Sequence, residues 1–204
     1  MKDVKNRGLN VFLNGMLRGN PALTMALGIG PAIFMTYDAA TALYMGLLTT
    51  LALVVSCMLM SALKRVLPRQ VRIPCHMLMA VGAITLIQFM LNAYFPMVES
   101  RANMYFLPVV LSSLVFGRAQ GYALRHSVSD SGLDALGVGI GYTFFLVIIA
   151  CLREMLGNGT LFGNAVFGGL IRPVSLFSMA PGVLFLAGCL SALVKRMTRG
   201  GGGR

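Results

Sequence analysis

Glycine and proline interrupt an otherwise apolar stretch at residues 20–36, which reads NPALTMALGIGPAIFMT. Proline removes a backbone hydrogen-bond donor and glycine weakens a helix, so Gly28, Gly30 and Pro31 predict a break within a helix. In the hydrocarbon of a membrane an unpaired backbone group is costly, so such a break must be covered by protein or line a cavity. The stretch therefore predicts a helix break buried inside a bundle of membrane helices.

The composition of the whole chain is typical of an integral membrane protein. Of its 204 residues, 57% are apolar and 11% are charged, whereas a soluble domain carries about 25% charged residues. We predict six apolar blocks, at residues 21–36, 39–63, 73–94, 104–116, 133–152 and 176–194. Most approach the roughly 20 residues that a helix needs to cross a bilayer. The expected fold is an all-α bundle of six transmembrane helices, in which the first and fourth helices are broken.

Basic residues separate between the two sides of these blocks. With the N-terminus inside, 14 of the 17 lysines and arginines are cytoplasmic, and only Arg101, Arg153 and Arg172 lie outside. The positive-inside rule then gives six crossings with both termini in the cytoplasm. Topology thus explains the net charge of +11, and no nucleic-acid partner is inferred. We expect a cytoplasmic or interfacial arm at 1–20, a membrane domain at 21–196 and a flexible tail at 197–204.

A residue pattern in the second block returns in the fifth. Ala42, Leu43, Gly46, Thr50 and Val54 recur 93 residues later as Ala135, Leu136, Gly139, Thr143 and Val147. Two repeats of three crossings insert in opposite senses because three is odd, which gives an inverted 3+3 repeat. The repeats would cover residues 21–95 and 104–196, with their broken helices meeting near the midplane. Chance recurrence of residues common in membrane helices is the alternative explanation.

Ionisable residues are absent from the predicted centres of the six blocks, so the sequence contains no proton relay. We place Asp130 and Asp134 at the cytoplasmic start of the fifth block, where a carboxylate favours the helix dipole. Asp130, with Ser129 and Ser131, is expected to cap the helix, and ion handling is the alternative. Arg153 and Glu154 lie at its outer end and are expected to pair. The chain has no Walker, GxSxG or HExxH motif. These absences argue against an autonomous pump or hydrolase, and no catalytic residue is predicted.

Several motifs resemble those of one family of membrane subunits. They are NPAL at 20–23, LGIGPA at 27–32, VRIP at 71–74, AYFP at 93–96, FGRA at 116–119, LGVGIGYT at 136–143 and LREMLGNGTLFG at 152–163. Together they resemble the E subunit of Rnf electron-transport complexes. The D subunit of sodium-translocating NADH:quinone oxidoreductases is similar. The resemblance runs over residues 20–194, which is nearly the whole chain.

The resemblance implies a membrane subunit of a hetero-oligomeric Rnf complex in the bacterial inner membrane. Such a complex would couple electron transfer between ferredoxin and NAD to the translocation of Na⁺ or H⁺, so enzyme activity would belong to the complex. The partners implied are a homologous A-type six-helix subunit and further subunits that carry flavins and iron–sulfur clusters. In this family an iron–sulfur centre lies between the two homologous subunits, and cysteines of the broken helices hold it.

The chain departs from the family at both of those cysteine positions. By the resemblance they fall at Gly30 and Ser113, which have no sulfur, so no cofactor or metal is assigned to this chain. Cys57, Cys75 and Cys189 are alternative ligands for a displaced centre, although free cysteines usually pack as small apolar residues. The candidate structural or conduit residues are Gly28, Gly30, Pro31, Ser112, Ser113 and Gly117.

Two other functions stay open at the level of the sequence. The first is a stand-alone secondary transporter of a small solute, because half-helix ends and backbone carbonyls bind solutes without any charged side chain. The second is a subunit that supports assembly without redox chemistry.

Overall fold

The computed structural model describes Val11 and residues 28–64, 68–94, 112–162, 164–165 and 175–200. These ranges contain helices α3 (Ile29–Met35), α4 (Ala39–Leu63), α5 (Arg72–Tyr94), α8 (Ser113–Arg118), α9 (Val128–Gly157), α10 (Ser175–Ser178) and α11 (Ala180–Gly200). A 3₁₀ turn, η2 (Arg69–Val71), leads into α5, and a π-helix, η4 (Ala119–Ala123), follows α8. Strands β1 (Thr160–Leu161) and β2 (Asn164–Ala165) pair antiparallel, with Thr160 opposite Ala165 and Leu161 opposite Asn164. Apart from this short hairpin, the described residues confirm an all-α fold.

Three helices, α4, α5 and α9, are long and apolar enough to cross a membrane. They confirm the predicted blocks at 39–63, 73–94 and 133–152 as helices, and α9 is longer than predicted, with 30 residues. Residues 21–27 of the first block and 104–111 of the fourth lie outside the described residues. Helix α11 ends at Gly200 and so extends into the segment predicted as a flexible tail.

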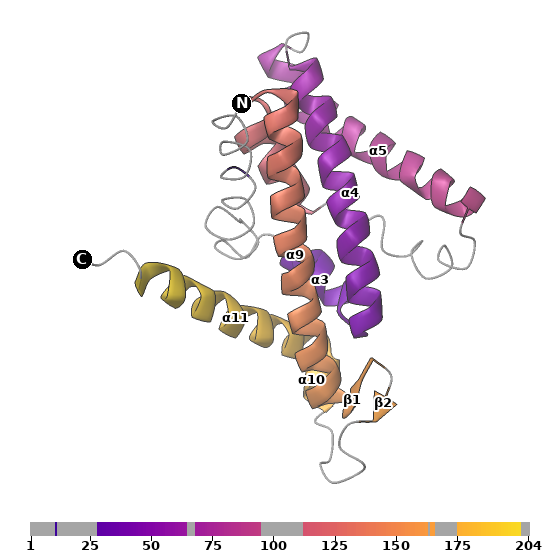
Figure 1. Ribbon diagram of the computed structural model, residues 1–204, viewed down its shortest axis with the longest axis vertical. Helices are drawn as coiled ribbons and strands as arrows, with labels where there is room; N and C mark the ends of the chain where they lie inside the picture. The colour runs from indigo at the N-terminus through magenta and orange to yellow at the C-terminus, as the bar shows by residue number, and fades with distance from the viewer. Residues whose placement is uncertain are drawn as a thin grey trace, which may run out of the picture.

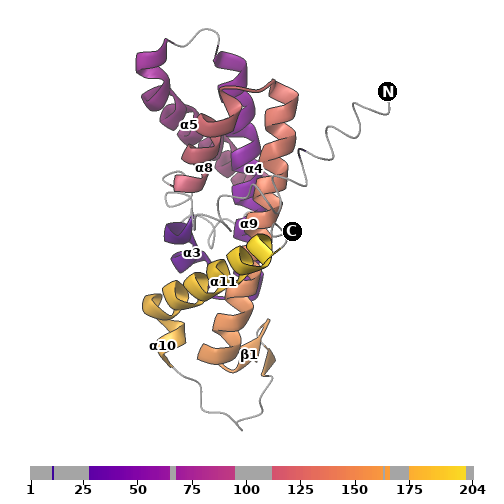
Figure 2. The same ribbon diagram turned by 90° about the vertical axis from the view of Figure 1, so that its left-hand side faces the viewer.

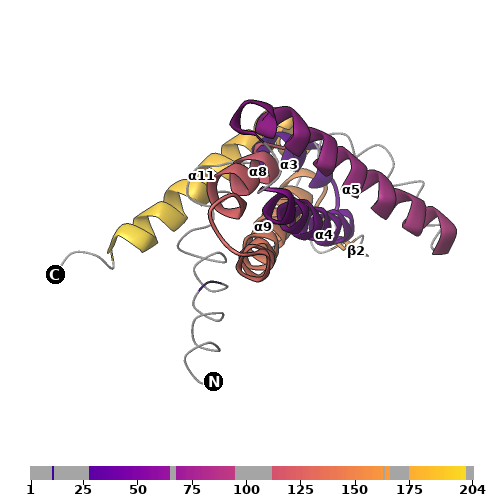
Figure 3. The ribbon, with the colours of Figure 1, turned by 90° about the horizontal axis from the view of Figure 1, so that it is seen from above.

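Helices α4 and α9 form the centre of the molecule and run antiparallel, side by side (Figure 1). Their buried side chains, among them Leu53 and Met60 of α4 and Val138 and Leu146 of α9, belong to one hydrophobic core. Helices α5 and α11 diverge from this pair in opposite directions (Figure 3). Helices α8 and α3 lie one above the other beside the pair (Figure 2). The central pair therefore supports both short helices.

Small residues allow α4 and α9 to pack closely. A Cβ added at Gly46 would lie 2.5 Å from Thr143 Cγ2, and one added at Gly139 would lie 2.5 Å from Thr50 Cγ2. The hydroxyl oxygens of Thr50 and Thr143 are 3.2 Å apart. Each helix thus places a glycine against a threonine of the other helix, and the two threonine hydroxyls lie in contact between these two pairs. Such close approach at small residues is how membrane helices associate.

Candidate functional site at the helix break

Gly28 is the point at which three separate parts of the chain meet. It precedes α3, and its N–H donates to Ser113 Oγ at 3.1 Å, at the start of α8. Its carbonyl accepts from the hydroxyl of Tyr142, in the middle of α9, at 2.9 Å. Both backbone groups of Gly28 are therefore bound by side chains distant in sequence, and in an apolar setting such backbone groups need partners.

The backbone conformation at this point requires glycine. Gly28 has φ +88°, in the left-handed region that residues with a Cβ rarely adopt. An added Cβ would also lie 3.0 Å from Cε2 of Tyr142, whose ring is fully buried. Gly28 is thus a point of tight contact between the chain and α9. Residues 21–27 lie outside the described residues, so the predicted helix break stays a prediction.

Pro31 is buried in the first turn of α3, where its missing N–H removes no helical hydrogen bond. Gly30 is exposed next to it. The three residues therefore have different surroundings: Gly28 contacts Ser113 and Tyr142, Pro31 is buried in the first turn of α3, and Gly30 is exposed.

Ser112 and Ser113 have different hydrogen-bond partners. Ser112 is buried and caps α8, since its Oγ accepts from the N–H of Val115 at 3.3 Å. Ser113 contacts Gly28 across the molecule and is otherwise exposed. Gly117 is also exposed, four residues further along α8. The structure therefore brings Gly28 and Ser113 together, while Ser112 supports the helix that carries Ser113. We call the contact of Gly28 with Ser113 and Tyr142 the junction.

Sequence reasoning missed Tyr142. Tyr142 belongs to the motif LGVGIGYT, but it was not among the predicted site residues. A tyrosine in the middle of an apolar span was the available signal, because a buried tyrosine hydroxyl usually finds a hydrogen-bond partner.

A buried ion pair holds α8 to α9 at a distance from Gly28. Arg118 Nε donates to Asp134 Oδ2 at 2.6 Å, and its NH2 group bonds to Oδ1 of the same carboxylate. Asp134 is 2% exposed and lies about two turns inside α9. The sequence placed Asp134 at the mouth of the block, favouring the helix dipole; it is instead a buried partner of Arg118. Ser127, and not Asp130, provides the N-cap of α9.

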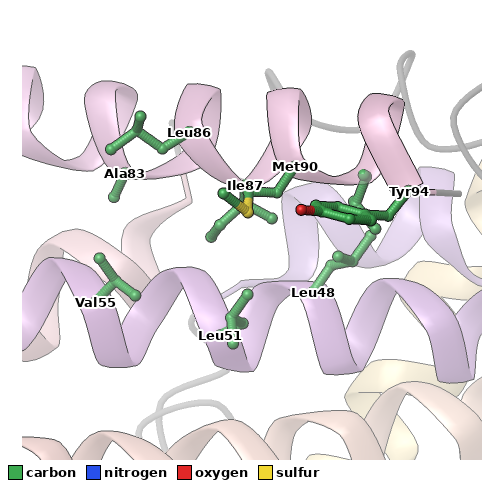
Figure 4. A pocket seen from close by; sticks show the side chains of 9 residues that line it. Leu48, Leu51, Val55, Ala83, Leu86, Ile87, Met90 and Tyr94 are labelled. Atoms are coloured by element: carbon green, nitrogen blue, oxygen red, sulfur yellow. The ribbon is translucent and has the colours of Figure 1, made fainter.

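A cavity of about 410 Å³ opens between α4 and α5, away from the junction (Figure 4). Side chains within residues 48–55 and 83–94 line it, and all are apolar except for the hydroxyl of Tyr94. A surface of this chemistry suits apolar groups and provides no ligands for an ion.

The comparisons with known proteins fit this architecture. The family Rnf-Nqr, described as Rnf-Nqr subunit, membrane protein, matches residues 8–191. This chain belongs to the Rnf-Nqr family. The resemblance inferred from the motifs is thereby confirmed.

Similar members of the Rnf-Nqr family are E subunits. One is the E subunit of the Na⁺-translocating ferredoxin:NAD⁺ oxidoreductase complex of Acetobacterium woodii, 32% identical over 91% of this chain and 94% of that protein. Another, from the proton-translocating ferredoxin:NAD⁺ oxidoreductase complex of Clostridium ljungdahlii, is 31% identical over 91% of this chain and 87% of that protein. A third, from an ion-translocating oxidoreductase complex of Edwardsiella ictaluri, is 39% identical over 76% of this chain and 66% of that protein.

Gly30 and Ser113, which the motif resemblance places at the two family cysteine positions, do not fit as ligands of a metal cluster. Gly30 has no side chain, and a Cβ there would have nothing within 4 Å. The Ser113 hydroxyl accepts a hydrogen bond from Gly28. The four cysteines, on α4, α5, α9 and α11, are free thiols. Within the described ranges no three histidine, cysteine or acidic side chains gather closely enough to bind a metal.

Proposed function

We propose that this chain is the E-type membrane subunit of an ion-translocating ferredoxin:NAD⁺ oxidoreductase complex. The observation that carries the proposal is the match to the E subunit from Acetobacterium woodii over nearly the full length of both chains. The chain acts as an enzyme only within that complex, which moves Na⁺ or H⁺. The named functions of the relatives favour this role over a stand-alone solute transporter or a subunit used only for assembly.

We further propose six membrane crossings arranged as an inverted repeat, with segments 21–95 and 104–196 as its halves. The matched contacts of Gly46 with Thr143 and of Gly139 with Thr50 support this arrangement. Gly46 and Gly139, like Thr50 and Thr143, are 93 residues apart, and their reciprocal contacts are what a two-fold relation between α4 and α9 would produce. The basic residues favour cytoplasmic termini in the bacterial inner membrane, with 1–20 as the arm and 21–196 as the membrane domain.

The junction is proposed as this chain's half of the conduit, facing a homologous A-type subunit. Gly30, Ser113 and Gly117 are exposed on the α3 and α8 side of the molecule, and such exposure suits a protein partner. Large apolar side chains on α5 and α11, including Phe89 and Phe185, are also well exposed. Flavins and iron–sulfur clusters would then be held by other subunits.

The proposal is tested in inverted membrane vesicles from a strain that lacks this chain. We expect loss of ion uptake driven by reduced ferredoxin and NAD⁺, and recovery when the chain is restored. An affinity tag on the chain should co-purify a second, homologous six-span subunit. Ion uptake that is normal without the chain, or solute transport by the chain alone in liposomes, would refute the proposal.

The metal content is tested separately. The chain expressed without its partners should contain no stoichiometric iron, because Gly30 and Ser113 provide no thiolate. Stoichiometric iron that is lost on changing Cys57, Cys75 or Cys189 would contradict this expectation.

A further inference from the structure

Two adjacent charged residues, Arg153 and Glu154, are buried near the C-terminal end of α9. Arg153 is 6% exposed and Glu154 is 1% exposed. A buried charge is unfavourable unless hydrogen bonds satisfy it. The sequence predicts that these two side chains pair with each other, and the structure shows that each of them also binds another helix.

Arg153 binds the C-terminal ends of two short helices. Its NH1 group donates to the carbonyl of Ile33, in the last turn of α3, at 3.2 Å, and lies 3.4 Å from Thr36 Oγ1. Its NH2 group donates to the carbonyl of Ser178, at the end of α10, at 2.6 Å. The guanidinium also lies 5.4 Å from the centre of the Tyr37 ring. The last carbonyls of a helix lack internal partners, and a cation next to them is favourable.

Glu154 binds the start of α4. Its Oε2 accepts from the N–H of Ala39, the first residue of α4, at 3.1 Å, and its Oε1 accepts from Thr160 Oγ1 at 3.1 Å. Asp38, the residue before α4, makes no capping hydrogen bond with its own side chain. A carboxylate at a helix N-terminus is stabilising, so Glu154 takes the place of the missing side-chain cap.

We propose that Arg153 is a positioning residue for the junction. Helix α3 has seven residues and is too short to be stable alone, so its position depends on contacts with the rest of the chain. Ser113 and Tyr142 hold it at Gly28, and Arg153 holds it at Ile33 and Thr36. Together with Glu154, which fixes the start of α4, Arg153 sets where α3 presents Gly28 and Gly30.

The other end of α9 holds α8 in a similar way, through the ion pair of Asp134 with Arg118. Asp134 and Arg153 are about 28 Å apart along the helix at 1.5 Å per residue, close to the roughly 30 Å of a bilayer core. One helix thus anchors both short helices of the junction, each at one boundary of the apolar layer. The inference rests on the proposed role of the junction in the complex.

The test measures hydrogen exchange and ion uptake in the complete complex, with Arg153→Met as the main variant. A hydrogen bond to a charged group contributes about 1.5–3 kcal/mol, so amides 32–35 of α3 should exchange at least about tenfold faster. Amides in the centre of α9, at 138–150, should keep their rate. Ion uptake per NADH formed should fall. Lys195→Met, at an exposed position on α11, is the matched control and should change neither quantity.

Arg153→Lys is the second variant, in case the methionine variant fails to assemble. It keeps the charge but lacks the planar fork that reaches two carbonyls, so both the α3 exchange rate and the ion uptake should lie between those of wild type and Arg153→Met. Unchanged α3 exchange in either variant would overturn the proposal. Faster α3 exchange with unchanged ion uptake per NADH would overturn the positioning role. A wild-type complex without ferredoxin-driven uptake would instead refute the proposed function, while the exchange rates would still decide whether Arg153 holds α3.

Discussion

Substituting either glycine of the α4–α9 contact should destabilise the chain to the same extent. In Gly139→Ala the new carbon would lie 2.5 Å from Cγ2, 2.7 Å from Oγ1 and 2.8 Å from Cβ of Thr50. Thr50 is β-branched, and its Oγ1 lies 2.8 Å from the carbonyl of Gly46, so the side chain has little freedom to move away. The helices must therefore separate. Gly46→Ala meets Thr143 at the same three distances.

The magnitude follows from three contributions. Overpacking a tight core costs about 1–3 kcal/mol, and we take the upper end because the whole threonine side chain is in the way. Separation also weakens the contact between Thr50 and Thr143, which is worth about 0.6 kcal/mol in membrane helices. The higher helix propensity of alanine offsets this loss by about 1 kcal/mol. We expect each variant to lose about 2 to 3 kcal/mol of unfolding free energy.

The assay is unfolding of the purified chain in mixed detergent micelles with increasing dodecyl sulfate. Circular dichroism is the suitable signal, because the chain has no tryptophan. Gly82→Ala is the matched control, since a Cβ on that helical glycine has nothing within 4 Å. The packing argument is refuted if Gly139→Ala is as mild as this control. The inference that the two contacts are equivalent is refuted if the unfolding free energies of Gly46→Ala and Gly139→Ala differ by more than about 1 kcal/mol. Such a difference would exceed the scatter expected between equal contacts.

Three further substitutions probe the remaining contacts. Tyr142→Phe removes the donor to the Gly28 carbonyl and should lower the unfolding free energy by about 1 kcal/mol in the same assay; an unchanged curve would contradict that hydrogen bond. Asp134→Asn leaves the charge of Arg118 without its partner carboxylate and should cost about 3 kcal/mol, seen as a lower melting temperature of the complex. Gly157→Ala would place a Cβ 2.4 Å from the hydroxyl oxygen of Ser178, the last residue of α10. Amides of α10 and the start of α11 should then exchange faster than in wild type.

The sequence predicted the long helices well because their signal is local. The second block was predicted at 39–63, the bounds that α4 has in the structure, because the stretch between Asp38 and Lys64 is mostly apolar and contains no charged residue and no proline. The bounds of α9 were predicted too short, at 133–152. Its helix continues through polar residues at both ends. Ser127 caps its start, and the ends of α3 and α4 bind Arg153 and Glu154 near its C-terminal end.

The contacts of the junction were only partly predictable. Glycine and proline drew attention to Gly28, and the idea of two halves placed the segments of Gly28 and Ser113 near each other. The structure describes a hydrogen bond between these two residues, while the broken helices and the repeat stay predictions. The partner from α9, Tyr142, was not predicted, because which hydroxyl reaches a given carbonyl depends on how distant helices pack. The binding of Arg153 to Ile33, 120 residues away, has the same cause.

The continuity of α9 limits how this protein can change in length. One uninterrupted helix carries Asp134, Tyr142 and Arg153, each of which binds a different part of the molecule. The distances between these side chains, and the directions in which they point, are therefore set by the helix. One residue inserted between Asp134 and Arg153 would rotate one of these side chains about the helix axis by about 100° and shift it by about 1.5 Å relative to the other. Insertions should therefore be tolerated in the connections between helices. The number of residues between 134 and 153 should stay constant, because a change in it would misplace one of these contacts.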